Sequence, residues 1–228
     1  MSNESVKGFG YFGKVPARGD FIQANLPNDF VISWSEWLQA VIAVSKEQQD
    51  EKWLDLYLTS PVWHFALSPG VCSETTLIGT LMPSVDQVGR HFYFTIAKPV
   101  KGGPISYWSD KGWCQPAEDK ILSVLDDDTD VVEWAENIKN LEVVDYKHVA
   151  LNLENYANIS NQLVVTSESE LDTDRLLHFH SKQALGRYCI WWTQGSDHVP
   201  ECTLFTEGLP LVSQFSAMLD GDWEKWGW

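Results

Sequence analysis

The residues that come nearest to a chemical motif lie at the N-terminus, where glycines recur with the spacing G-x-G-x-x-G over Gly8–Gly13. In a dinucleotide site this run follows a strand and opens a helix, whose backbone N–H groups bind the pyrophosphate. Only seven residues precede the run here, and Pro16 and Gly19 follow it too closely for a helix to form. A phosphate loop is also incomplete, because Val15 follows Lys14 where a Ser or Thr would hold magnesium. We therefore predict no cofactor, and we expect the glycines to let an aromatic strand pass close to another backbone.

Histidine, cysteine and carboxylate side chains supply no complete catalytic or metal-binding set. His178 and His180 are two residues apart, so their imidazoles would diverge on a helix and could share a metal only on a strand. The acidic run 126–130 lacks the glycine and glutamate of a calcium loop and is expected to be a solvated turn. The four cysteines form no C-x-x-C pair and are expected to remain free thiols. We predict no catalytic residues, no metal site and no enzymatic activity.

Tryptophan is the unusual feature of the composition, with 12 in 228 residues. Indole rings bury a large area, so each of them can serve the core. Trp is also enriched in binding hot spots, and exposed indoles would be anchors for a partner. The candidates for that role are the late clusters Trp191, Trp192, Trp223, Trp226 and Trp228. The last three lie at the chain end, where docking on the chain's own body is favoured over a free tail.

Composition and charge narrow the class of protein. With 44% hydrophobic and 21% charged residues, the chain is expected to be globular with a sizeable core. Its 16 basic and 32 acidic residues give a net charge of −16, which argues against nucleic acid and membrane surfaces as partners. Because no secretory leader or long apolar run is visible, we expect a cytoplasmic protein. We expect one domain over 1–228, with two closely packed halves joined near 99–112 as the alternative.

Hydrophobic periodicity predicts the elements that would hold these residues. One helix is predicted from a row of apolar positions that recur every three or four residues: Phe30, Trp34, Trp37, Leu38, Val41 and Ile42. Asn28 or Asp29 would cap it. Three neighbouring strands over 62–67, 75–82 and 91–97 are expected to form an antiparallel meander. Further along we predict helices over 117–125, 131–141, 172–184 and 209–219, a strand over 162–166, and a hairpin of 188–193 with 199–206. The alternation indicates an α/β sandwich with a mixed, largely antiparallel sheet.

Several multi-residue motifs occur in a fixed order along the chain. They are GYFGKVPARGDF over 10–21, W-x-x-WL over 34–38, YL-x-SPVW over 57–63, PSVD-x-VGR over 83–90, IWWT-x-G over 190–195 and GLP over 208–210. In this order they resemble the TagF family, also called ImpM, of type VI secretion-associated proteins. The resemblance runs from about residue 8 to about residue 220 and implies a three-layer αβα sandwich.

The resemblance also implies a function. It indicates a non-enzymatic, cytoplasmic accessory protein of a bacterial type VI secretion system, which holds the apparatus off after translation. The partner that it implies is the forkhead-associated scaffold protein of the same system, with a PP2C-type phosphatase or other apparatus components as further partners. A structural or assembly subunit of the apparatus is the alternative, and an enzyme that uses the glycine-rich N-terminus is a third hypothesis.

The two densest motifs contain four charged residues, Arg18, Asp20, Asp86 and Arg90, together with Ser84. We expect the charges to form a hydrogen-bonded clasp between the N-terminal segment and the loop after Met82. The alternative is an exposed recognition patch for a partner.

Overall fold

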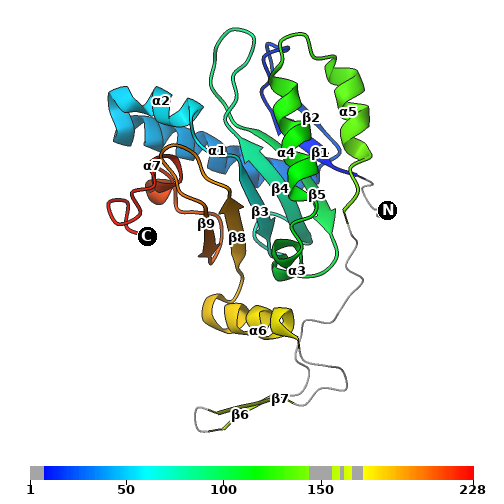
Figure 1. Cartoon of the computed structure of the whole chain (residues 1–228), viewed down its shortest axis with the longest axis vertical. Coiled ribbons are helices and arrows are strands. Elements are labelled where there is room, and N and C mark those ends of the chain that lie inside the picture. The colour runs from blue at the N-terminus through cyan, green and yellow to red at the C-terminus, as the bar shows by residue number, and fades with distance from the viewer. Residues whose placement is uncertain (1–7, 144–155, 160–161, 166–171) are drawn as a thin grey trace.

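The computed structural model describes residues 8–143, 156–159, 162–165 and 172–228. Its centre is a seven-stranded sheet with the strand order β2-β1-β5-β4-β3-β8-β9 (Figure 1). The strands are β1 (Gly10–Gly13), β2 (Ile22–Ala24), β3 (Trp63–Leu67), β4 (Thr76–Met82), β5 (Phe94–Val100), β8 (Cys189–Thr193) and β9 (Cys202–Thr206). Every pairing in this sheet is antiparallel, so the expectation of a mixed sheet needs correction.

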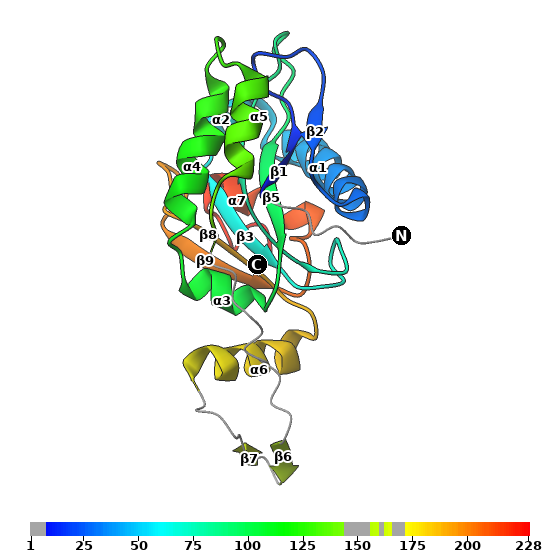
Figure 2. The same cartoon turned by 90° about the vertical axis from the view of Figure 1, so that its right-hand side faces the viewer.

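Helices cover both faces of the sheet and make a three-layer α/β fold (Figure 2). One face carries α1 (Asn28–Gln49), α2 (Trp53–Leu58) and α7 (Ala217–Asp220), with 3₁₀ turns at Asp50–Lys52 and Val212–Gln214. The other face carries α3 (Pro104–Ser109), α4 (Cys114–Leu122) and α5 (Val131–Lys139), with a 3₁₀ turn at Ser123–Leu125. The remaining elements lie between α5 and β8 in the sequence. They are a separate hairpin of β6 (Tyr156–Ile159) and β7 (Gln162–Val165), followed by α6 (Thr173–Leu185).

The inner strands are buried on both sides because their alternate side chains enter two different cores. On β3, Phe65 and Leu67 join the core under α1, whereas Ala66 joins the core under α3 and α4. On β8, Trp191 faces α1 and Trp192 faces the opposite layer. Side chains of a strand point alternately to its two faces, so two covering layers require apolar residues at nearly every position.

The predicted helix through Phe30 and Trp34 is confirmed as α1, and its row of apolar residues is buried against the sheet. The three-strand meander and the late hairpin are confirmed as well. The cap is different from the prediction, because no side chain caps α1 and Asp29 accepts only the N–H of Phe30 at 2.8 Å.

The single helix predicted over 209–219 is wrong. The chain forms the 3₁₀ turn, bends, and then forms the short α7. The physical reason is that the Pro210 carbonyl accepts the Trp37 indole N–H at 2.9 Å, while Leu211 is extended. Tertiary hydrogen bonding therefore takes a backbone group that a continuous helix would use.

The Gly- and Pro-rich segment 99–112 connects the end of β5 to α3 and the turn before α4. Strands from before and after this segment lie in the same sheet, since β3 pairs with β8. In the part of the chain that the structure describes, no helix combines the length and apolarity that crossing a bilayer requires.

Candidate functional site

Three of the sequence motifs meet at one end of the sheet. The turn 14–21 joins β1 to β2, the loop 83–93 joins β4 to β5, and the C-terminal end of α2 lies against that loop. In Figure 1 the two loops extend beyond the same end of the strands. Antiparallel pairing of β1 with β5 brings them together, because the end of β1 and the start of β5 are adjacent at Gly13 and Phe94.

A tyrosine fixes the base of the loop 83–93. The buried Tyr57 hydroxyl donates to the Ser84 carbonyl at 2.8 Å and accepts the Ser84 N–H at 3.0 Å. Burial raises the pKa of Tyr57 above its ordinary value, and the hydrogen bond to Ser84 offsets this only in part. The hydroxyl therefore stays neutral and acts as a backbone clamp. The Ser84 residue singled out in the sequence contributes here through its main chain.

The Asp86 carboxylate organises the loop and ties it to the N-terminal turn. One of its oxygens accepts the N–H groups of Val88 at 3.1 Å and Arg90 at 2.8 Å. The other accepts Lys14 Nζ at 2.9 Å and Arg90 Nε at 2.6 Å. An Arg90 terminal nitrogen also donates to the Gly19 carbonyl. We call Lys14, Asp86, Arg90 and the Gly19 carbonyl the clasp.

The clasp leaves Asp86 no free acceptor direction, since a carboxylate offers about four lone-pair sites and four donors occupy them. Burial by itself would raise the pKa of Asp86, but the hydrogen bonds from Arg90, Lys14 and Val88 outweigh it and lower the pKa well below its ordinary value. The carboxylate therefore remains charged and fully engaged. It is suited to holding two loops in register and not to accepting a proton from a substrate.

Two of the charged residues predicted for the clasp lie at its margin. The Arg18 carbonyl accepts the Gln87 N–H at 3.1 Å, but the Arg18 guanidinium is exposed and donates to the Ala17 carbonyl. The Asp20 carboxylate is fully exposed, and its nearest oxygen lies 4.0 Å from an Arg90 nitrogen. Lys14, which was not predicted as a clasp member, takes the buried position beside Asp86. The sequence around Lys14 does not predict its ion pair, because its partner Asp86 lies in a loop 72 positions away.

The clasp carries an exposed surface made of both loops. Its members are Arg18, Phe21, Gln87, Val88 and Arg90, and we call them the clasp surface. Val88 is 70% exposed and Phe21 is 46% exposed, although the Phe21 ring also stacks on Phe12. Exposed apolar groups beside guanidinium groups are typical of protein-binding surfaces. The surface stands on a rigid base, because the clasp underneath fixes both loops.

The five tryptophans proposed as partner anchors are not free surface groups. Trp191 and Trp192 are 0% and 3% exposed, so the interpretation of these two as anchors is wrong. They lie on β8, an inner strand with both faces covered, and Trp191 stacks on Trp34 with ring centroids 5.9 Å apart.

The C-terminal tryptophans are half-buried and docked on the body. Trp228 Nε1 donates to the Gln214 carbonyl at 2.8 Å, and Trp226 Nε1 donates to Asp220 at 2.9 Å. Trp223 and Trp228 meet edge to face and pack against the core under α1. The expected docking of the tail is thereby confirmed.

The N-terminal glycines serve close backbone contacts, as predicted. A Cβ at Gly10 would lie 2.2 Å from the Asn25 carbonyl oxygen, and a Cβ at Gly13 would lie 2.3 Å from the Tyr93 carbonyl oxygen. The run forms strand β1, and the element that follows is strand β2. His178 and His180 lie on helix α6, where two residues of separation turn their side chains apart.

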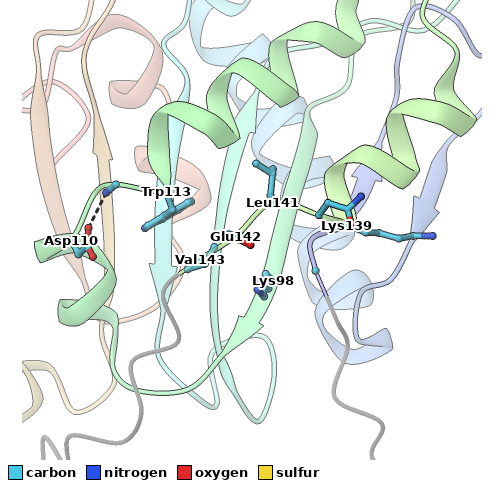
Figure 3. A pocket seen from close by; sticks show the side chains of 10 residues that line it. Lys98, Asp110, Trp113, Lys139, Leu141, Glu142 and Val143 are labelled. Atoms are coloured by element: carbon cyan, nitrogen blue, oxygen red, sulfur yellow. Dashed lines mark hydrogen bonds between the residues drawn. The ribbon is translucent and has the colours of Figure 1, made fainter.

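A cavity of about 700 Å³ lies at the other end of β1 from the clasp. Its lining includes Lys98, Asp110 and Trp113 together with the segment 139–143 (Figure 3). Asp110 accepts the Gly112 N–H at 3.0 Å, and Lys139 pairs with Glu136 at 2.6 Å. Across the described residues, no group of three or more His, Cys, Asp or Glu side chains could hold a metal ion.

With this geometry in hand, comparison with known proteins gives the family. Residues 10–141, more than half of the chain, match the model of the TagF N-terminal domain, described as type VI secretion system-associated. The chain belongs to the TagF family. The match contains both loops of the clasp and the whole of α1 to α5.

A solved structure extends the likeness of this TagF-family chain beyond the matched residues. The crystal structure of PA0076 from Pseudomonas aeruginosa PAO1 is 30% identical, with a TM-score of 0.79 over 93% of this chain and 94% of that chain. The likeness therefore extends well beyond residue 141, the end of the family match. Among curated proteins, no sequence matched this chain.

Proposed function

We propose that this TagF-family protein is a negative regulator of type VI secretion that acts after translation, by protein contact and without enzymatic activity. The observation that carries the proposal is the family match over residues 10–141, which associates the chain with the type VI secretion system. The clasp is consistent with a role in contact, because its central carboxylate is saturated by four donors and presents two loops as one rigid surface.

We further propose that the regulator acts in the cytoplasm on the forkhead-associated scaffold of the system, with a PP2C-type phosphatase as a second partner. The clasp surface is our candidate for the contact, because it combines exposed Val88 and Phe21 with the guanidinium groups of Arg18 and Arg90. Because the chain carries a net charge of −16, its encounter with a charged partner would be sensitive to salt.

The proposal is tested in cells by comparing effector release from deletion, wild-type and overexpressing strains. A repressor that works by contact obeys mass action, so release should fall as its level rises and level off near stoichiometry with its target. Transcript levels and the amounts of apparatus components should stay constant. Equal release from the three strains would overturn the proposal, and fixed-ratio recovery with the sheath or baseplate would favour a structural subunit.

A second experiment separates the surface from the fold. Val88→Glu places a charge on the clasp surface without touching the core, so it should keep the wild-type melting temperature and lose recovery of the scaffold on the tagged protein. The matched control is Ile32→Glu, on α1, where the side chain is 60% exposed. If both variants recover the scaffold equally, the contact lies elsewhere.

A further inference from the structure

The outer edge of strand β9 is an open end of the main sheet. Strand β9 is last in the strand order, and within the described residues its only ladder partner is β8. The strand has the sequence CTLFT, with no charge, glycine or proline. Exposed edges of this kind are templates for pairing with another strand. The opposite edge is the three-residue β2, which offers a shorter template.

The ladder pattern shows which backbone groups of β9 face outward. The Ser68 N–H donates to the Tyr188 carbonyl at 3.1 Å, so the backbone of Tyr188 points toward β3. Along an antiparallel strand the direction alternates with each residue, so Trp191 points its backbone toward β9. Trp191 is opposite Leu204, which therefore bonds inward. The N–H and C=O groups of Thr203 and Phe205 are consequently directed away from the sheet.

The side chains beside these groups form a small aromatic platform. Phe205 is 38% exposed, and its ring centroid lies 6.0 Å from that of Trp108 on α3. The Trp108 indole N–H lies 3.4 Å from the Thr203 hydroxyl, and the Lys111 ammonium lies 5.5 Å from the Trp108 ring. On the opposite face Leu204 packs against the core under α1. A strand added at this edge would find apolar contacts on both faces.

The charges that flank β9 indicate which kind of strand could pair with its outer edge. Glu201 and Glu207 are both exposed and stand immediately before and after the strand. If a second copy paired antiparallel about Leu204, Glu201 of each chain would face Glu207 of the other. Like charges placed directly opposite destabilise a strand pair, and two chains of net charge −16 repel each other. An extended segment with a basic residue at each end meets the same two carboxylates favourably.

We propose that the outer edge of β9 binds an extended segment of another protein, in which a short alternating apolar run is flanked by Lys or Arg on both sides. The segment adds an eighth strand through the backbone groups of Thr203 and Phe205, places an apolar side chain beside Phe205 and Trp108, and pairs its basic ends with Glu201 and Glu207. This surface is separate from the clasp surface, and the inference does not depend on the regulatory role proposed above.

The test uses the purified full chain and a fluorescent peptide, Lys-Thr-Val-Thr-Val-Thr-Lys, acetylated and amidated at its ends, which places its valines on the same face as its lysines and so beside Phe205 and Trp108. The lysines are spaced to meet both glutamates in either strand direction. The control peptide carries Glu at both ends. We expect the Lys-ended peptide to bind at least about tenfold more tightly by fluorescence anisotropy at low salt. Equal binding of the two peptides, or no binding at millimolar concentration, would overturn the proposal.

The site is checked with a matched pair of variants. Thr203→Pro removes an outward N–H and leaves the bonds to β8 intact, because edge strands tolerate proline at such positions. Thr203→Val keeps the N–H and removes only the hydroxyl near Trp108. We expect Thr203→Pro to weaken peptide binding about tenfold and Thr203→Val to stay within about twofold, with similar melting temperatures. Equal affinities of the two variants would rule out pairing at this edge.

Amide hydrogen exchange distinguishes the occupants. In the free protein the Thr203 and Phe205 amides should exchange much faster than the Leu204 amide, which bonds to β8, and the peptide should slow the first two. Protection of Thr203 and Phe205 without peptide, together with dimers in sedimentation, would show that a second copy occupies the edge and would contradict the proposal.

Discussion

The Lys14 ammonium lies 2.9 Å from the Asp86 carboxylate, in a buried ion pair between residues 72 positions apart in the sequence. We predict that Lys14→Met lowers the free energy of unfolding by about 1.5 to 3 kcal/mol, because it removes one charged donor from a carboxylate that stays buried. Urea unfolding of purified protein measures the change. Arg18→Ala is the control and should stay within about 0.5 kcal/mol of wild type, since its guanidinium is exposed.

Arg90 tests whether the clasp has a structural role at all. Its side chain is 56% exposed, so Arg90→Ala should cost less stability than Lys14→Met, yet more than Arg18→Ala. If Arg90→Ala melts at the wild-type temperature but no longer binds the partner, this residue serves recognition and the structural role is refuted for it.

Acid should weaken the protein partly through Asp86. The pKa of Asp86 in the folded state lies below its ordinary value of 3.8, so the unfolded chain binds the proton more readily. The stability that this carboxylate contributes is therefore present above that value and is lost as the pH falls through the folded-state pKa. Between about pH 6 and about pH 2, Asp86→Asn should lose less stability than wild type in urea unfolding. Parallel losses in the two proteins would contradict the assignment.

Gly79 on β4 is expected to be intolerant of a side chain. A Cβ at this position would lie 2.4 Å from the Ile96 carbonyl oxygen and 2.4 Å from a ring carbon of Phe65, its cross-strand neighbour. Gly79→Ala should cost about 3 kcal/mol through overpacking. Gly89→Ala is the comparison, because φ is +81° there but nothing lies within 4 Å, so only backbone strain of about 1 to 2 kcal/mol is expected. Thermal melts that rank Gly89→Ala as the worse variant would refute this packing argument.

The docked C-terminus should contribute to stability. Trp228→Ala removes an edge-to-face contact with Trp223 and the hydrogen bond to the Gln214 carbonyl, and we expect a loss of about 2 kcal/mol, roughly half the cost at a fully buried site. Trp228→Phe keeps most of the packing and should lose about 1 kcal/mol, from the hydrogen bond. If Trp228→Ala has the same free energy of unfolding as wild type, the docked C-terminus does not contribute to stability.

Sequence patterns predicted elements where the signal is local. The row from Phe30 to Ile42 has helical spacing, and it became α1. The helix predicted over 172–184 became α6, whose N-cap is Asp172, and the Asp172 carboxylate accepts the Arg175 N–H at 2.8 Å. The glycines at 10 and 13 were correctly assigned to close backbone contacts, since only a residue without a Cβ fits there.

The predictions that failed depend on contacts distant in the sequence. The helix expected over 209–219 does not form at Pro210, because the Pro210 carbonyl accepts the Trp37 indole N–H instead of a helical backbone N–H. Trp191 and Trp192 looked like surface anchors because a pair of indoles does not reveal that its strand lies inside a sheet. The clasp was located in the correct two motifs, but Lys14 was missed and Arg18 was placed too centrally, since spacing cannot tell a buried charge from an exposed one.

The position of β3 between β4 and β8 sets the order in which the nascent chain can complete its core. On the ribosome, β4 follows β3 almost at once, whereas β8 emerges only after β5 and the helices α3 to α6 have been made, and α7 follows later still. At ordinary elongation rates this leaves a delay on the order of ten seconds. During that interval the far edge of β3 has no partner and the Trp34 ring lacks the indole that later stacks on it. A fragment that ends near residue 141 would lack β8, so the edge of β3 would stay unpaired. The residues matched by the family model should therefore require chaperones or aggregate when they are made alone.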